Sequence, residues 1–120
     1  MTPAIYTYGF GIDGEPIECF LAAFTDTPCG GRMERAHLIP KQLIRRELRT
    51  LGIPRDEITA AVWDERAWRP ACRYHHRHMD MVRDLRIPRE GIPADTEQYA
   101  AQYGIEWWLT REYGPLEAAA

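Results

Sequence analysis

Aromatic and β-branched residues dominate two stretches near the N-terminus, whereas farther along the chain apolar residues recur every three to four positions between prolines and glycines. The stretches 5–10 and 17–24 are separated by turn residues at 11–16, which predicts a β-hairpin. A tight turn at 27–31 then precedes another short extended segment over 32–39. The first third of the chain is therefore predicted to form strands.

Prolines and glycines divide the remainder into predicted helices, which span 41–51, 70–85, 93–103 and 106–113. Pro70 is placed to begin the second of these, because its missing N–H is no loss in a first helical turn. Residues 54–57 predict only a short helical turn, and 61–63 a strand or loop edge. Strands combined with helices indicate an α+β fold, and 120 residues fit a single domain.

No stretch approaches the about 18 consecutive apolar residues of a membrane span, and the N-terminus lacks the basic and apolar regions of a signal peptide. The three cysteines, an odd number, do not form a self-contained disulfide framework. These features predict a cytoplasmic protein that does not interact with membranes.

Charge is unevenly distributed along the chain. Residues 32–89 hold 14 basic and 8 acidic residues, a formal charge of +6, whereas the two flanks together carry −9. All basic residues of the central stretch except Lys41 are arginine, whose guanidinium suits bidentate phosphate contacts. A phosphate-binding surface explains this distribution. A GC-rich genome explains the preference for arginine equally well.

All four histidines fall within the basic stretch, in the motifs AHLIP (36–40) and CRYHHRHMD (72–80). On the helix predicted from Pro70, His76 and Asp80 are one turn apart and can converge on one cation. An apolar stripe of Cys72, His75, Met79 and Val82 is expected on the neighbouring, inward-facing side. Histidine serves both proton transfer and transition-metal binding, so two such motifs suggest one composite site.

A strand ending in His, followed by two apolar residues and Pro and later by Cys-x-x-His-His on a helix, resembles the HNH, or ββα-metal, endonuclease family. The resemblance covers about residues 29–80 and implies a ββα-metal core with an N-terminal hairpin and C-terminal helices. The single domain would then comprise a hairpin over 1–25, the core over 26–85 and a helical extension over 86–120. Small members encoded in phage genomes cut DNA, often in support of genome packaging.

The resemblance implies hydrolysis of DNA phosphodiester bonds, with His37 as the general base that activates water. His76 and Asp80 would hold a catalytic Mg²⁺ or Mn²⁺, with Ni²⁺ or Zn²⁺ as alternatives. The family usually has another metal ligand just before the base, where this chain has Ala36. Glu34, two residues earlier on the same side of an extended strand, is predicted to replace it.

Double-stranded DNA is the partner that the resemblance implies. Contacts to its phosphates are predicted for Arg35, Lys41, Arg45, Arg73 and Arg77. Phage packaging proteins are further expected partners, with the host cytoplasm as the location for a phage-encoded protein. Symmetric cutting of both strands normally needs two copies, so a homodimer is compatible with this function.

Two features of the family are altered here. The central Asn of the family has its counterpart at Ala67, and the usual pair of Cys-x-x-Cys motifs reads Asp26-x-x-Cys29 and Cys72-x-x-His75. A structural zinc bound by Asp26, Cys29, Cys72 and His75 is one interpretation, because zinc accepts all three ligand types. Small buried side chains packed in the core are the other.

The same alterations leave a second function open. A non-catalytic module would keep the fold and bind DNA or a protein through its arginine surface or acidic ends. Loss of the ligand before His37 and of the Asn favours such a module, whereas the intact His37, His76 and Asp80 favour the nuclease. Near the C-terminus, Trp107 and Trp108 cannot both face inward, so one is expected to mark a dimer contact or other subunit surface.

Overall fold

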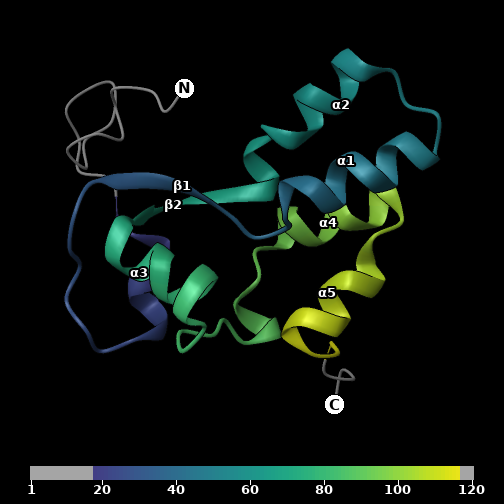
Figure 1. Ribbon diagram of the computed structural model, residues 1–120. Coiled ribbons are helices and arrows are strands. Elements are labelled where there is room, and N and C mark those ends of the chain that lie inside the picture. Colours follow the sequence, from purple (N-terminus) through teal and green to yellow (C-terminus); the bar gives the residue numbers. More distant parts are fainter. Residues whose placement is uncertain (1–17, 117–120) are drawn as a thin grey trace. The chain divides into compact units, whose positions relative to one another are not determined.

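The computed structural model describes residues 18–116, which form a mixture of helices and two strands (Figure 1). In chain order the elements are the 3₁₀ helix η2 (Phe20–Phe24), β1 (Met33–His37), α1 (Lys41–Thr50), α2 (Arg55–Val62), the 3₁₀ helix η3 (Glu65–Ala67), β2 (Trp68–Cys72), α3 (Arg73–Arg77), the π-helix η4 (His78–Val82), the 3₁₀ helix η5 (Arg89–Gly91), α4 (Ala94–Tyr103) and α5 (Glu106–Tyr113). The predicted α+β class is confirmed. Within residues 18–116, none of the helices is long and apolar enough to cross a membrane.

The described residues fold into two compact units that interleave along the sequence. The first unit comprises residues 18–36 and 69–87, and the second comprises 37–68 and 88–116. Neither unit coincides with the consecutive segments 1–25, 26–85 and 86–120 expected from the sequence. The organisation of the chain as one domain stays a prediction.

The sheet consists of two antiparallel strands, β1 and β2. At one end the backbone N–H of Arg73 donates to the oxygen of Arg32 at 2.9 Å. Hydrogen-bonded and non-hydrogen-bonded pairs alternate along antiparallel strands, so Pro70 stands at a non-hydrogen-bonded position opposite Arg35. Its missing N–H therefore costs the sheet nothing. The predicted helix start at Pro70 is wrong for this reason, and the helix begins at Arg73.

The helix that follows β2 has an α-helical first half, α3, and a π-helical second half, η4. Cys72 and His75 are buried, whereas Val82 is 55% exposed, so the predicted inner stripe is wrong at its far end. Gly31, with φ of +81°, lies under the start of this helix. A Cβ on Gly31 would lie 3.0 Å from the Cβ of Arg73, so the close approach requires glycine.

The structure describes residues 18–24 of the predicted N-terminal hairpin, and these residues do not form a strand. Phe20–Phe24 forms the 3₁₀ helix η2, which packs against α3, so the strand predicted over 17–24 is wrong at these residues. Leu21 is fully buried in this arrangement. The other strand, predicted over 5–10, lies outside the described residues.

The second unit contains the larger apolar core. Helix α1 packs against α2, and α4 packs against α5. The core residues are Ile39, Leu43, Ile44, Leu48, Ile58, Ala61, Val62, Ala67, Tyr99, Ala100, Ile105 and Leu109. The helices predicted over 41–51, 93–103 and 106–113 are confirmed. Residues Arg55–Val62 form a full helix, α2, rather than a short helical turn followed by a strand or loop edge.

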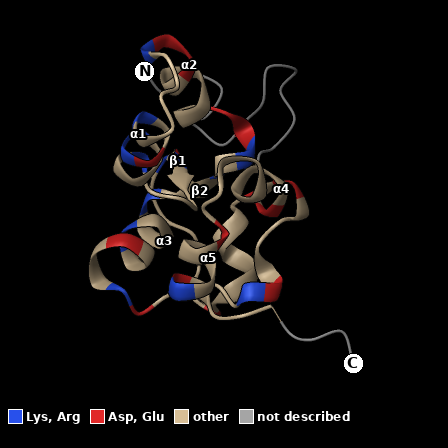
Figure 2. Ribbon diagram, turned by 90° about the vertical axis from the view of Figure 1, so that its right-hand side faces the viewer, with Lys and Arg blue, Asp and Glu red and all other residues tan. Residues whose placement is uncertain are grey.

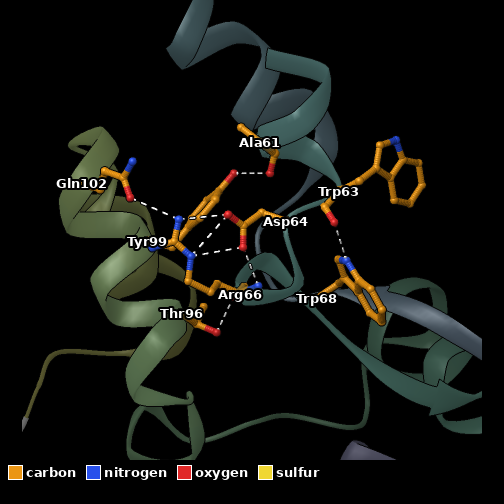
Figure 3. Close-up of polar contacts among 8 residues, drawn as sticks. All are labelled: Ala61, Trp63, Asp64, Arg66, Trp68, Thr96, Tyr99 and Gln102. Atoms are coloured by element: carbon orange, nitrogen blue, oxygen red, sulfur yellow. Dashed lines mark hydrogen bonds and ion pairs between the residues drawn. The ribbon is translucent and has the colours of Figure 1, made fainter. Parts of the chain in front are cut away.

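Helix α4 anchors the loop between α2 and β2 (Figure 3). The Tyr99 hydroxyl donates to the backbone oxygen of Ala61 at 2.6 Å, and the Thr96 hydroxyl donates to that of Arg66 at 2.6 Å. The Arg66 guanidinium pairs with Asp64 at 2.9 Å and donates to Gln102 at 3.1 Å. These bonds fix the loop that leads into β2.

Arg89 holds the C-terminal helices of the second unit together. Its buried guanidinium donates two hydrogen bonds to Glu97, at 2.8 and 2.9 Å. It also donates to the Thr110 hydroxyl at 3.0 Å and to the Gly114 backbone oxygen at 2.8 Å. Since Glu97 lies on α4 and Thr110 on α5, one side chain ties the two helices to η5.

Candidate metal centre and active-site residues

Three cysteines and one histidine converge in the first unit. The ligand atoms of Cys19, Cys29, Cys72 and His75 all lie within 4.8 Å of one another. Cys19 immediately precedes η2, and Cys72 and His75 lie where β2 leads into α3. This cluster could bind a metal ion such as zinc. Cys19 takes the fourth place that the sequence had suggested for Asp26, which is exposed and outside the cluster.

The orientation of His75 directs one ring nitrogen at the sulfurs. Its Nε2 lies 2.9 Å from the backbone oxygen of Thr27, which can only accept, so Nε2 carries the proton. The other ring nitrogen, Nδ1, faces Cys19 Sγ at 3.5 Å and Cys29 Sγ at 3.7 Å. In tetrahedral zinc sites, bonds of about 2.3 Å to sulfur and about 2.0–2.1 Å to nitrogen place these two atoms about 3.6 Å apart. The donor set and spacing therefore fit zinc.

Backbone groups surround the sulfur atoms with hydrogen-bond donors. The N–H of Cys72 donates to Cys19 Sγ at 3.2 Å, and the N–H of His75 donates to Cys72 Sγ at 3.4 Å. Burial raises the pKa of the Cys72 thiol, but bonds from backbone N–H groups and the neighbouring cysteines outweigh it and lower the pKa overall. Burial, with the neighbouring cysteines, raises the pKa of Cys29 to about 12. A divalent ion would stabilise both thiolates.

A second cluster in the first unit contains three residues that the sequence had suggested as metal ligands. The His76 ring lies between two carboxylates, with Nδ1 2.9 Å from Glu34 Oε1 and Nε2 3.2 Å from Asp80 Oδ2. The hydrogen bond to Asp80 is the main cause that raises the pKa of His76, and Glu34 adds to it. The two carboxylates face different ring nitrogens. This geometry favours an orienting role for Glu34 over the ligand role predicted from the sequence.

A cleft of about 360 Å³ opens over this cluster. Its lining consists of Glu34, Arg73, His76, Arg77, Asp80 and Met81. Arg73 and Arg77 are exposed on α3, one turn apart. Two of the predicted phosphate-binding arginines therefore line the same cleft as the predicted metal pair. Arg73, His76 and Arg77 lie on α3, and Asp80 lies on η4, which continues it.

His37 ends β1 and belongs to the second unit. Its Nε2 lies 2.7 Å from the backbone oxygen of Val62, which can only accept, so Nε2 carries a proton. The ring packs edge-on against Trp63, with 5.3 Å between centroids, and the ammonium of Lys41 lies 4.8 Å from the Trp63 ring centroid. These contacts hold the imidazole in a fixed orientation, as a general base requires.

Backbone contacts join the segment after His37 to the loop before β2, where the resemblance aligns Ala67 with the central Asn of the HNH family. Ala67, at the corresponding position, is fully buried, and its oxygen accepts the N–H of Leu38 at 2.9 Å. The residue after His37 is thus joined to the loop before β2. Tyr113 adds a second restraint by donating its hydroxyl to the Leu38 oxygen at 2.5 Å.

Sequence reasoning missed Cys19 in the metal cluster. The chain has three cysteines, and Cys19 is the one outside the zinc ligand set predicted from the sequence. That unassigned thiol is the signal that points to it. No protein-family model, curated protein or solved structure matches this chain. The resemblance to the HNH family stays a prediction.

Proposed function

We propose that this protein is a metal-dependent nuclease that hydrolyses phosphodiester bonds of DNA. The observation that carries the proposal is the His76 imidazole, bracketed by two carboxylates and opening into a cleft lined by Arg73 and Arg77. Carboxylates and an imidazole bind a divalent cation, and arginines bind phosphate. This combination suits a substrate that is itself a phosphate diester.

His76 and Asp80 would hold the ion. Their facing atoms are 3.2 Å apart, close to the about 3 Å that separates adjacent ligands of an octahedral ion with bonds of about 2.1 Å. Glu34 would accept a hydrogen bond from the Nδ1–H of His76 and so keep Nε2 directed at the ion. Bound there, Mg²⁺ or Mn²⁺ supplies positive charge that stabilises the phosphate and the departing 3′ oxygen.

His37 would act as the general base. Its Nε2–H donates to the Val62 carbonyl, which orients the ring, and the imidazole would take the proton of the attacking water. The water oxygen forms the new bond to phosphorus as the bond from phosphorus to the 3′ oxygen breaks. Arg73 and Arg77 would grip the flanking phosphates.

We further propose that zinc occupies the cluster of Cys19, Cys29, Cys72 and His75 in a structural role. All four places are filled by protein ligands, as in structural zinc sites, whereas catalytic sites keep one place open. The ion would tie the residues before η2 to the junction of β2 and α3. It would thereby position the helix that carries His76.

The test is cleavage of supercoiled plasmid with Mg²⁺, Mn²⁺, Ni²⁺ or EDTA. We expect metal-dependent nicking by the unmodified protein and at least a ~100-fold loss in His37→Ala and in His76→Ala. His78→Ala is the matched control, because His78 lies on the same helix but pairs with Asp84 at 2.7 Å. It should retain most of the activity.

Two results would contradict the proposal. One is equal cleavage by the unmodified protein, His37→Ala and His76→Ala, which would indicate a contaminant. The other is no cleavage with any ion by folded protein that still binds DNA, which would leave a non-catalytic binding module. Binding of Mn²⁺ to the metal pair, measured by calorimetry on His37→Ala, separates loss of the base from loss of the ion.

A further inference from the structure

One face of α1 carries a row of arginines. Arg45, Arg46 and Arg49 stand at spacings of three and four residues, which places them along one side of the helix. All three are exposed, and Figure 2 shows blue, basic segments on α1. At 1.5 Å of rise per residue, Arg45 and Arg49 are about 6 Å apart along the helix axis. The row therefore presents several guanidinium groups in a line.

This row borders two adjacent hollows of the second unit. The first, of about 570 Å³, is lined by Gln42, Leu43, Arg45, Arg46, Arg49, Trp107, Trp108, Arg111 and Glu112. The second, of about 440 Å³, is lined by Arg45, Arg49, Ile53, Arg55, Ile58 and Thr59. Because Arg45 and Arg49 line both, the two hollows adjoin. We refer to them together as the basic groove, with Arg111 on α5 in the first hollow and Arg55 on α2 in the second.

Little of this positive charge is neutralised. Arg46 lies 3.3 Å from Glu47, and Glu112 lines the first hollow beside four arginines. Within residues 18–116, Arg45, Arg49 and Arg111 form no hydrogen bond or ion pair with another side chain. Like charges held this close repel one another, and an anionic partner would relieve the repulsion.

We propose that this groove docks the phosphate backbone of double-stranded DNA. Guanidinium groups bind phosphate oxygens in bidentate fashion, and a row of them suits a polyanion better than a single small anion. Duplex DNA offers the denser charge, about one per 1.7 Å of axis against about one per 3.4 Å for each strand. Trp107, 44% exposed, adds an apolar wall against the sugars. Docking here requires neither His37 nor the metal pair, so it goes beyond the proposed hydrolysis.

The test is fluorescence anisotropy with a short labelled duplex, over a range of salt concentrations and without added divalent ions. The full chain carries His37→Ala so that the duplex stays intact. Adding Arg45→Ala and Arg49→Ala together should raise Kd at least ~10-fold. It should also reduce the slope of log K against log salt by about 2, since each phosphate contact contributes about 0.9. Alanine preserves the exposed helix, which circular dichroism confirms.

The control compares single substitutions. Arg45→Ala and Arg49→Ala are each measured alone beside Arg86→Ala, which removes the same charge from an exposed arginine of the other unit. The proposal is overturned if Arg86→Ala weakens binding as much as Arg45→Ala or Arg49→Ala. It is also overturned if the duplex does not bind, if the corresponding single strand binds as tightly, or if an acidic peptide displaces the duplex at equal charge concentration. Binding that depends on α1 in a protein without nuclease activity would support the groove and contradict the hydrolysis.

Discussion

Nε2 of His75 lies 2.9 Å from the backbone oxygen of Thr27, and this contact decides which ring nitrogen faces the three cysteines. A carbonyl can only accept, so Nε2 is protonated and Nδ1 is available to an ion. Histidine ligands in metal sites commonly donate their second nitrogen to such a group. The position is thus prepared for metal binding by the backbone, and not by the cysteines alone.

We expect the purified protein to contain one zinc ion, measured by native mass spectrometry, and Cys19→Ser to lose it. Serine removes the sulfur ligand, and bound structural zinc contributes directly to folding, so the melting temperature should also fall. The outcome separates the cluster seen in the structure from the set suggested by the sequence.

Asp26→Asn is the matched control for this prediction. Asp26 is exposed and outside the cluster, so its variant should keep both the zinc and the melting temperature. Loss of zinc in Asp26→Asn, with zinc retained in Cys19→Ser, would show that Asp26 is the fourth ligand.

The ion pair of Asp64 with Arg66 should make part of the protein's free energy of unfolding depend on pH in the acid range. The side-chain hydrogen bond from Arg66 is the largest cause that lowers the pKa of Asp64 below its usual value. A carboxyl with a lowered folded-state pKa stabilises the protein above its unfolded pKa, near 4. That stabilisation is lost as the pH falls through the folded value. We expect Asp64→Asn to cost at most about 1 kcal/mol at pH 7, because it removes the charge that pairs with Arg66, whereas asparagine can still cap η3.

Urea unfolding between pH 7 and pH 2 checks this expectation. The free energies of unfolding of the two proteins should converge as the pH approaches the lower end, where Asp64 is protonated. A difference that stays constant over the whole range would assign the effect to packing instead.

Arg89 should be intolerant of substitution. Arg89→Ala leaves Glu97 without its buried partner and removes the bonds to Thr110 and Gly114, so we expect a loss of about 3–5 kcal/mol. Arg89→Lys keeps the charge but not the planar fork, and should lose about 2 kcal/mol. Arg86→Lys, on an exposed side chain, should be nearly neutral in the same denaturation experiment. Equal stability of Arg89→Lys and Arg86→Lys would argue against the buried bidentate pair.

Placing at position 67 the Asn that the HNH resemblance would align there should destabilise this chain. Ala67 is fully buried in the core of the second unit, so a larger amide would overpack it and cost about 1–3 kcal/mol. Ala101→Asn, on the exposed side of α4, should cost less than about 1 kcal/mol. Thermal unfolding of the two variants makes the comparison. A more stable Ala67→Asn protein would show that the loop has room for the amide.

Helices α1, α4 and α5 could be predicted because their signals are local. Each follows a proline or a turn, and Gly104 ends α4 in the left-handed conformation with φ of +69°. The start of α3 could not be placed in this way. Pro70 suits a first helical turn and a non-hydrogen-bonded strand position equally well, and pairing with β1 decided between them.

The candidate sites show the same division. One helical turn separates His76 from Asp80, so the sequence alone predicted their proximity. The contact between Cys19 and His75 joins residues 56 positions apart, and no local pattern predicts such a contact. The position of η2, with Leu21 buried, brings Cys19 to the cluster.

The sequence by itself determined the α+β class, three of the five α-helices found within residues 18–116, the basic central stretch and most of the residues able to bind a metal. Tertiary structure decided that Phe20–Phe24 is helical, that Pro70 lies in a strand, and that Cys19 rather than Asp26 joins Cys29, Cys72 and His75. The physical reason is range. Capping, turn residues and helical spacing act within a few residues, whereas burial and strand pairing depend on which distant segments meet.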